Sequence, residues 1–383
     1  MKYPLDGVKV VDLAAYIAGA YCSSLLADMG ARVIKIESHA GDGFRTIGGS
    51  FQGWNRGKRA MVLNLTTSEG REILSRMVAD ADVLTENYRP GVAEKLGADY
   101  DTLTRVNSRM IYCSVTGYGG SGPLRETPAF DPLLQAQSGA MAAQGGEGNP
   151  PAFHRVAISD YSCAILAAYG IAAALFHRAR TGQGQRLETS LLNAAIAVQA
   201  GEFLSYPDRT PSPRVNALGV SSTYRLYQAS DEWFFLSCGD DESWSKMCEA
   251  LEMRYLAQRF PNNVARLKHD SEIGSALEGI FCTRARQHWL SRLQAAGVKC
   301  APSRRMRDIH QDPQAIHLGL TADAVSPDVG PIKQMGLPFR FSDTPGVIWG
   351  PSPSHGQHTD EILSEMGFSD REIAGLRERG AVG

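Results

Sequence analysis

Short apolar runs alternate with segments of helical periodicity over the first third of the chain, and this alternation restricts the fold more than any other feature. Residues 7–13 (GVKVVDL) and 31–37 (ARVIKIE) are typical of strands, and residues 20–29 between them are typical of a helix. The pattern continues with strands predicted at 61–65, 83–86 and 110–116 and helices at 68–80, 91–96 and 100–106. Strands that alternate with helices predict a parallel sheet, so we expect an open α/β fold here.

The length and the distribution of prolines predict two domains. The chain has 383 residues, and domains commonly have about 100–200 residues. Beyond the first third we expect helices at 133–143 and 161–180, a strand at 185–189 and a helix at 191–204. The Pro-rich stretch at 206–213 is typical of a linker. We therefore predict a large domain (1–205), a linker (206–222), a small domain (223–325), and a linker with a return to the large domain (326–383).

Within the small domain we expect two strands in residues 223–235, around a turn at 228–232, and helices near 242–251 and 286–296. The last segment carries two helix-like stretches at 358–366 and 370–379.

Charge and cysteine content exclude several classes of protein. The 39 basic and 41 acidic side chains give a net charge of −2, and the absence of long like-charged runs argues against nucleic-acid partners. Seven cysteines without CxxC spacing and nine histidines without an HExxH motif predict neither disulfides nor a metal site. The first residues do not resemble a signal peptide, which predicts a cytoplasmic protein.

The most apolar segment, residues 163–176, is shorter than the roughly 20 residues that a membrane span needs. We interpret it as part of a buried helix and expect no membrane contact.

A glycine-rich loop follows the strand predicted at 110–116. Gly117, Gly119 and Gly122 satisfy the GxGxxG pattern of a dinucleotide site. Pro123 follows directly, however, and no helix begins where its N-terminus should receive a pyrophosphate. A flexible or ligand-covering loop is therefore the favoured interpretation.

Two polar positions have both a structural and a functional interpretation. Asp160 directly precedes the helix predicted at 161–180. Its structural interpretation is an N-cap and its functional interpretation is a carboxylate nucleophile or base, and the two can hold together. Residues 86–91 (ENYRPG) end a strand in a Pro-Gly turn. This segment is either a solvated turn or an anion clamp that combines Arg89, Lys95 and a helix N-terminus. The basic turn at 54–59 (WNRGKR) allows the same two interpretations.

A set of motifs extends along nearly the whole chain and includes PLDGVKVVDL, AGAYCSSLLADMGARVIKIE, GDGFR, WNRGKR, ADVLTENYRPGVAEKLG, MIYCSVTGYGGSGP, FDPLLQAQSG and ISDYSCAILAAYGIAAALFHRARTGQGQRLETSLLNAA. In this order they resemble the motifs of the class III coenzyme A transferases, the formyl-CoA and carnitine CoA-transferase family that also contains the α-methylacyl-CoA racemases. The resemblance implies a Rossmann-like large domain formed by N- and C-terminal segments, a smaller inserted α+β domain and an interlocked homodimer.

The same resemblance implies a function and a set of site residues. Asp160 takes the place of the family's nucleophile, which forms mixed-anhydride and aspartyl-CoA thioester intermediates as CoA moves from an acyl-CoA to a carboxylic acid. CoA is then a substrate, and no permanently bound cofactor is expected. The expected CoA contacts are Tyr16, Ile17, Ala18, Leu63, Asn64, Thr66, Asn87, Tyr88, Arg89 and Lys95. The acyl-pocket candidates are Phe130, Gly239 and Asp240.

Some positions depart from the family pattern. Ser38 stands where members commonly have an arginine and Thr66 where some have a lysine, so we expect other cations to complete the phosphate clamp. The candidates for this role are Arg45, Arg56 and Arg59.

Two further departures bear on the reaction. Racemases place a proton-transferring histidine where this chain has Phe130, which favours a transferase. Of the glycine run in the formyl-CoA branch only Gly239 remains, which disfavours formate and oxalate and favours a larger acid, such as a dicarboxylate, a carnitine-like acid or an aromatic acid. A 2-methylacyl-CoA racemase and a non-catalytic CoA-binding protein remain the alternative functions.

Overall fold

The computed structural model describes residues 2–47, 49–146, 148–207 and 218–383. Its contacts divide the chain into two compact units. The first comprises Met1–Ser138, His154–Phe203 and His310–Gly383, and the second comprises Gly139–Phe153 and Leu204–Ile309. The first unit thus resumes at His310, earlier than the boundary that we predicted near 326. Most of the predicted linker, residues 208–217, lies outside the described residues.

A parallel sheet of six strands organises the first unit. Its strands are β1 (Lys9–Asp12), β2 (Arg32–Glu37), β3 (Arg59–Val62), β4 (Val83–Glu86), β5 (Ile111–Thr116) and β6 (Gln185–Ser190). They lie in the order β3-β2-β1-β4-β5-β6, and every neighbouring pair is parallel. The strand order reverses between β1 and β4, which is where open α/β sheets bind ligands, beyond the carboxyl ends of the strands. The predicted α/β fold is confirmed.

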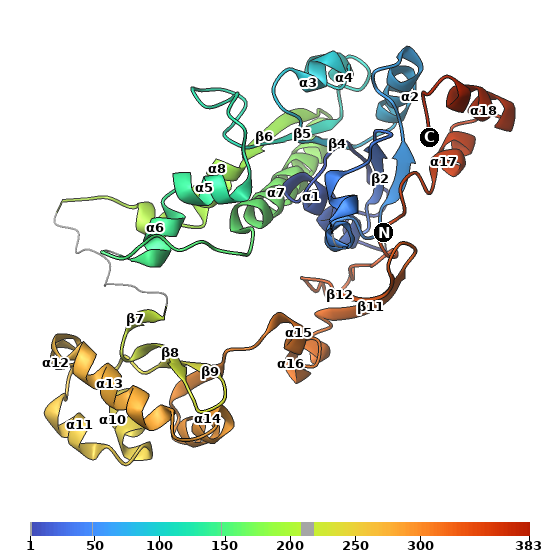
Figure 1. The fold of residues 1–383 in the computed structure, drawn as a ribbon. Coiled ribbons are helices and arrows are strands. Elements are labelled where there is room, and N and C mark those ends of the chain that lie inside the picture. The colour runs from blue at the N-terminus through green and yellow to red at the C-terminus, as the bar shows by residue number, and fades with distance from the viewer. Residues whose placement is uncertain (1, 48, 147, 208–217) are drawn as a thin grey trace. The chain divides into compact units, whose positions relative to one another are not determined.

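Helices cover both faces of this sheet (Figure 1). On one face α1 (Ala18–Asp28) and α7 (Ile158–Thr181) pack over apolar strand residues that include Val10 and Val33. On the other face α2 (Ser68–Ala79), α17 (Thr359–Glu365) and α18 (Asp370–Glu378) pack over residues that include Val11. Successive strand residues point to opposite faces, so the nearly continuous apolar runs of these strands supply both cores.

Helix α7 is longer than the apolar segment that we identified. It has 24 residues and is long and apolar enough to cross a membrane by length and composition, so our length argument against a span was wrong. Its residues Cys163, Ala167 and Ile171 are buried against the sheet, which makes α7 a core helix of this unit. Its outward face carries exposed apolar side chains, including Tyr169 at 73% exposure.

Several predicted helices are interrupted or short. The helix expected at 133–143 is divided into α5 (Asp131–Gln137) and α6 (Ala140–Gly145), because Gly139 takes a left-handed backbone with φ 84°. The helix expected at 191–204 becomes α8 (Leu191–Ala197) and α9 (Ala200–Phe203). Two further predicted helices are single turns, α3 (Val92–Lys95) and α4 (Tyr100–Thr104).

A regular hairpin spans the predicted boundary at 325–326 between the small domain and the linker that follows it. Residues Thr321–Ser326 (β11) and Gly330–Met335 (β12) form an antiparallel hairpin. It follows two short helices, α15 (Met306–Ile309) and α16 (Pro313–His317). Two 3₁₀ turns, Gly43–Thr46 and Ser50–Gly53, lead from β2 toward β3.

The second unit has an antiparallel sheet in the order β10-β9-β8-β7. Its strands are β7 (Gly219–Ser221), β8 (Tyr224–Gln228), β9 (Trp233–Ser237) and β10 (Lys299–Pro302). Its helices are α10 (Asp241–Ala250), α11 (Arg254–Arg259), α12 (Asn263–Lys268), α13 (Asp270–Phe281) and α14 (Arg286–Ala295). Phe234, Trp244 and Phe281 lie in its core. The predicted pair of strands around residues 228–232 is confirmed by β8 and β9.

Candidate active site

The carboxylate of Asp160 lies in the first turn of α7. The helix begins at Ile158, so Asp160 is not its N-cap, and our structural interpretation of this residue was wrong. The cap is supplied from α5 instead, because Oδ1 of Asp131 accepts hydrogen bonds from the backbone N–H groups of Ser159 (2.8 Å) and Asp160 (3.4 Å). Asp131 therefore does the capping and leaves the carboxylate of Asp160 available.

Gln135, one turn further along α5, holds the chain that leads into α7. Its Nε2 donates to Asp131 Oδ2 and to the carbonyl of His154 (3.0 Å), and its Oε1 accepts from the N–H of His154 (3.1 Å). Gln135 and Asp131 are both buried. Hydrogen bonds between buried groups fix local geometry, so this pair sets where α7 starts and where Asp160 points.

The electrostatic environment of Asp160 is unusual for a carboxylate. Burial, and then the nearby charge of Asp131, raise the pKa of Asp160 to about 7. Among the described residues, no hydrogen bond or ion pair involves its carboxylate oxygens. A carboxylate that is poorly solvated, unpaired and partly ionised near neutral pH has the properties of a nucleophile or a general base.

Aromatic side chains link Asp160 to the turn between β1 and α1. The ring of Tyr16 meets Phe130 edge-on at 6.5 Å and Phe44 at 5.7 Å, and Phe44 meets Trp54 at 4.9 Å. Trp54 Nε1 donates to the hydroxyl of Tyr161, the neighbour of Asp160 (3.0 Å). Phe130, one of the residues that we expected at the acyl pocket, is 57% exposed.

Sequence reasoning missed Phe44, Trp54 and Tyr161. All three lie in or beside motifs on which the family resemblance rests, namely GDGFR, WNRGKR and ISDYSC, and that was the available signal.

The start of α1 brings together several predicted CoA contacts. Tyr16 and Ile17 precede the helix and Ala18 is its first residue, and no side chain among the described residues caps this end. Asn87, at the end of β4, reaches the same turn: its Oδ1 accepts from the N–H of Ala15 (2.9 Å) and its Nδ2 donates to the Ala15 carbonyl (2.7 Å). The amide of Asn87 thus shapes the turn.

The residues expected near adenine form a turn after β3. Leu63 is buried in the core, so it offers only its backbone to a ligand at this position. The hydroxyl of Thr66 donates to Asn64 Oδ1 (2.6 Å), and the amide of Asn64 donates to the carbonyl of Gly380 (3.0 Å).

The residues of the predicted phosphate clamp differ in accessibility. Tyr88 is largely buried, and burial raises the pKa of its hydroxyl to about 12. Arg89 and Lys95 are exposed and form no ion pair within the described part of the chain. The adjoining helix α3 has only four residues, so it adds little of the dipole that we expected to support the clamp.

The cations considered as replacements at the clamp are already paired. Arg45 donates to both carboxylate oxygens of Glu37 (2.8 and 2.6 Å), and Arg59 pairs with Glu361 and Glu365. Arg56 is buried and donates to both oxygens of Asp28 (3.1 and 2.6 Å). Ser38 contributes a carbonyl that His355 contacts at 3.0 Å.

Gly239 and Asp240 belong to the second unit. The carbonyl of Gly239 accepts a hydrogen bond from the buried Arg266 (2.9 Å), and Asp240 caps α10 by accepting from the N–H of Ser243 (2.8 Å). These bonds fix the segment that we compared with the glycine run.

The loop with the GxGxxG pattern lacks the helix that a dinucleotide site needs. Thr116 accepts from the N–H of Gly119 (3.0 Å), and Gly120 donates to Glu188. In the described chain the next helix after this loop is α5, which begins at Asp131. The disfavoured dinucleotide interpretation therefore gains no support from the geometry.

Comparison with known proteins finds similar proteins along nearly the whole chain. A family model described as CoA-transferase family III matches residues 5–359. The succinate–glutarate CoA-transferase of Agrobacterium fabrum is 31% identical over 389 residues, which cover 97% of each chain. The acetyl-CoA:oxalate CoA-transferase of Acetobacter aceti is 36% identical over 314 residues, which cover 79% of this chain and 81% of the relative.

Among solved structures, a CAIB/BAIF family protein from Brucella suis is similar, with 33% identity and a TM-score of 0.88. The match covers 96% of this chain and all of the other.

Proposed function

This chain belongs to CoA-transferase family III, and from that premise we propose that it transfers CoA between an acyl-CoA and a carboxylic acid through covalent intermediates on Asp160. One observation carries the proposal: the carboxylate of Asp160 is partly desolvated, without a hydrogen-bond partner among the described residues, and has a pKa of about 7. Covalent catalysis suits this exchange because a free carboxylate is a poor electrophile and must be activated before a thiolate can attack it.

The proposed sequence uses four acyl transfers. The carboxylate of Asp160 attacks the thioester carbonyl of the donor, the C–S bond breaks, and a mixed anhydride and a CoA thiolate form. The thiolate then attacks the aspartyl carbonyl of the anhydride and releases the donor acid as a carboxylate. The acceptor carboxylate attacks the resulting aspartyl-CoA thioester, which gives a second anhydride and thiolate. Attack of this thiolate on the acceptor's acyl carbonyl forms the new thioester and regenerates the Asp160 carboxylate.

Trapping the enzyme-bound intermediate tests this assignment. Hydroxylamine added during incubation with succinyl-CoA or acetyl-CoA should convert the Asp160 side chain into a hydroxamate, which peptide mass spectrometry locates. Asp160→Asn should remove the label and lower turnover by roughly 10³-fold or more, since the nucleophile is absent. Asp101→Asn, at an exposed position on α4, is the matched control and should keep both. A hydroxamate elsewhere, or turnover retained by Asp160→Asn, would exclude the mechanism.

We propose that CoA lies along the carboxyl ends of β1, β3 and β4. Tyr16, Ile17 and Ala18 face the thiol arm, and Leu63, Asn64 and Thr66 lie near the adenine. Asn87, Tyr88, Arg89 and Lys95 lie along the phosphates. Arg89 and Lys95 are exposed and have no ion-pair partner among the residues that the structure describes, which suits them to phosphate oxygens. Replacing Lys95 by alanine should raise the KM for acyl-CoA and reduce its salt dependence.

We propose a carboxylic acid larger than formate as the acceptor, and transfer in preference to racemisation. Phenylalanine at position 130 cannot transfer a proton, so solvent deuterium should not enter the α-carbon of 2-methylacyl-CoA. Exchange without an acceptor acid would favour the racemase instead. Because one relative uses oxalate by name, a panel of acids should include oxalate beside glutarate, succinate and aromatic acids.

We propose that the protein is a cytoplasmic interlocked homodimer in which a second copy covers the outward face of α7. Ile165, Tyr169 and Phe176 lie on this face and are 55%, 73% and 67% exposed. Such a stripe of large apolar side chains is typical of an interface. Sedimentation should show dimers, and Tyr169→Lys should weaken them. A wild-type monomer would refute the dimer.

A further inference from the structure

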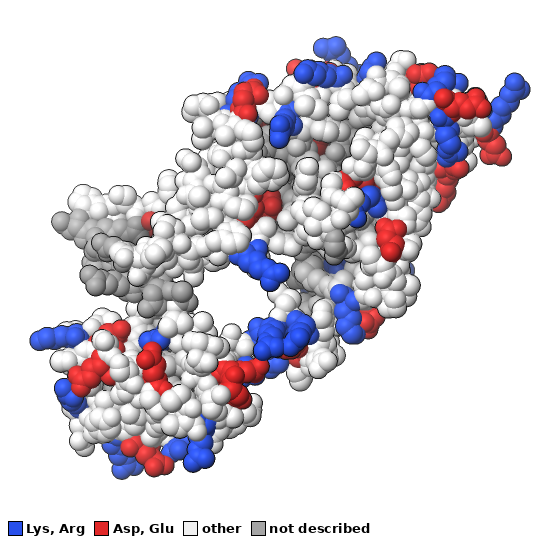
Figure 2. Space-filling model, viewed as in Figure 1, with Lys and Arg blue, Asp and Glu red and all other residues white. Residues whose placement is uncertain are grey.

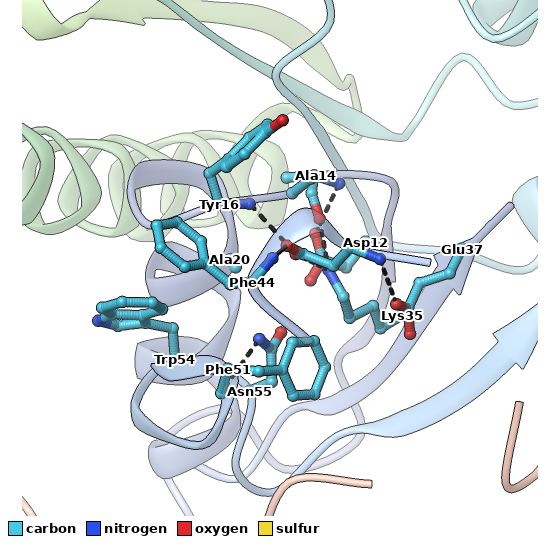
Figure 3. A network of polar contacts seen from close by, with 12 residues as sticks. Asp12, Ala14, Tyr16, Ala20, Lys35, Glu37, Phe44, Phe51, Trp54 and Asn55 are labelled. Atoms are coloured by element: carbon cyan, nitrogen blue, oxygen red, sulfur yellow. Dashed lines mark hydrogen bonds and ion pairs between the residues drawn. The ribbon is translucent and has the colours of Figure 1, made fainter. Parts of the chain in front are cut away.

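The turn that joins β1 to α1 is held by side chains at every backbone polar group from Ala14 N to Tyr16 N. Asp12 Oδ1 accepts from the N–H of Ala14 (3.0 Å), and Lys35 Nζ donates to the carbonyl of Ala14 (2.6 Å). Asn87 bonds both groups of Ala15, as described above. Asp42 Oδ2 accepts from the N–H of Tyr16 (3.1 Å). Residues from β1, β2 and the loop after β2 thus meet at this turn (Figure 3). Asn87, which directly follows β4, reaches the same turn.

The backbone of Tyr16 shows why such support is needed. Its φ is 62°, a left-handed conformation that residues other than glycine seldom adopt. Conformations of this kind cost on the order of 1 kcal/mol or more and persist only where the surroundings enforce them. The side-chain bonds to the turn are the enforcing contacts.

Two buried ion pairs, Lys58–Asp12 and Lys35–Asp42, support the turn. Lys58 Nζ donates to Asp12 Oδ2 (2.8 Å), to the Ala20 carbonyl (2.7 Å) and to Asn55 Oδ1 (2.8 Å), so all of its protons are used. Lys35 Nζ lies 3.2 Å from Asp42 Oδ2. The side chains of these two ion pairs are at most 1% exposed. Buried ion pairs contribute little net stability, so their use at this turn needs another explanation.

We propose that Asp12, Lys35, Asp42 and Lys58 form a positioning network that fixes the turn 14–16 and thereby orients the backbone N–H groups at the start of α1 toward the thioester of the bound acyl-CoA. The inference rests on the proposed function. Helix α1 has 11 residues, and in the described chain its N-terminus has no side-chain cap. N–H groups in that position stabilise developing negative charge on a carbonyl oxygen if their geometry is set beforehand.

The contacts of Tyr16 connect this network to Asp160. Its ring lies against Phe130, which directly precedes Asp131, and Asp131 accepts the N–H bond of Asp160. A shift of the turn therefore changes the relation between the thioester site and the nucleophile. Small misplacements of this kind lower the rate of the chemical step more than the affinity for substrate.

Two matched substitutions test the network. Asp42→Asn removes the charge that pairs with Lys35 and holds the N–H of Tyr16. Asp28→Asn removes an equally buried carboxylate whose partner, Arg56, has no bond to the turn. The two variants should melt at similar temperatures. We expect kcat to fall by roughly 10- to 100-fold in Asp42→Asn, with the KM for acyl-CoA changed by less than about threefold, and Asp28→Asn to retain wild-type kcat. Equal kcat values in the two variants, or a loss confined to KM, would overturn the proposal.

Amide hydrogen exchange provides a readout that does not need turnover, and its first arm uses the wild-type protein alone. In the wild-type protein without ligand, the amides of Ala14, Ala15 and Tyr16 should exchange slowly, as helical core amides do. Asp42→Asn should speed exchange at Tyr16 and Asp28→Asn should not. Fast exchange of these amides in the wild type would refute the network even if CoA transfer is confirmed. If these amides are protected but the protein transfers no CoA, the proposed function and the role of the turn at the thioester are refuted. The turn would then be shown to be rigid and nothing more.

Discussion

Two buried groups of carboxylates lie near the same turn, and they differ in their partners. Around Asp12 every carboxylate has a cation: burial alone would raise the pKa of Asp12, but Lys58 and Lys35 bring that pKa below its usual value. In the described part of the chain Asp160 forms no ion pair, and burial together with Asp131 raises the pKa of Asp160 to about 7. Burial is common to both sites, so the partner decides whether a carboxylate holds structure or is available for chemistry.

The same comparison separates Lys58 from surface lysines. Burial lowers the pKa of Lys58 to about 8 although Asp12 opposes this shift, because an ammonium group without water is destabilised. Lys58 remains protonated at neutral pH and supplies its three hydrogen bonds. Lys58 thus keeps its positive charge, and loss of that charge would leave the carboxylate of Asp12 without its cation.

The largest expected effect comes from breaking the paired group. Lys58→Met should lower the free energy of unfolding by about 3–5 kcal/mol, because it leaves Asp12 buried without its cation. Lys9→Met, at the exposed pair with Asp80, should change it by less than about 1 kcal/mol. Urea denaturation at about neutral pH would measure the change in the free energy of unfolding for both variants. Similar losses in the two variants would show that the buried pair is not special.

Removing the charge of Asp160 should change the free energy of unfolding in the opposite direction. Asp160→Asn should raise the free energy of unfolding by about 2 kcal/mol at a pH near 8, because an uncompensated buried charge is removed. The sign follows from the raised pKa: the unfolded chain ionises near 3.8 and the folded chain near 7, so stability falls as pH rises between these values. The gain should therefore vanish in acid, below about pH 4. A loss of stability near pH 8 would contradict the comparison.

The pH dependence of turnover should report the same carboxylate. We expect kcat/KM to fall about tenfold per pH unit below about 7, where Asp160 becomes protonated. Asp131→Asn keeps an oxygen for the N–H groups of α7 but removes a negative charge, so this limb should move to lower pH. The exposed Asp101→Asn variant should leave the limb in place. An unmoved limb in Asp131→Asn would mean that burial alone sets the pKa.

The smallest effect concerns the turn between the two groups. Tyr16→Gly should stabilise the backbone by about 0.5–1 kcal/mol, because glycine adopts a positive φ without strain. The loss of the half-exposed ring offsets part of this gain. Thermal unfolding measures the balance, and Tyr224→Gly, whose ring is similarly exposed but whose φ is not positive, is the control and should only destabilise.

The sequence predicted the strands of the large sheet well because parallel strands buried on both faces appear as apolar runs with local boundaries. It was less successful where one residue breaks a pattern, as Gly139 does in the helix expected at 133–143. The sequence wrongly predicted Asp160 as the N-cap of α7, because the N–H groups of the first turn are capped by Asp131, 29 residues earlier. The pairing of Asp12 with Lys58 was equally out of reach, since partners 46 positions apart are defined only by the folded sheet. Local periodicity contains no information on such pairs.

The position of the last helices has a consequence for how the protein is made. The amide of Asn64 donates to Gly380, 316 positions later, and α17 and α18 complete the core on the β3 side of the sheet. At about 5–20 residues per second, a ribosome delivers that partner roughly 15–60 s after Asn64. For that interval the apolar residues under β3 and α2 have no cover from their own chain. Binding by a chaperone during synthesis would protect this side of the sheet until the last helices arrive.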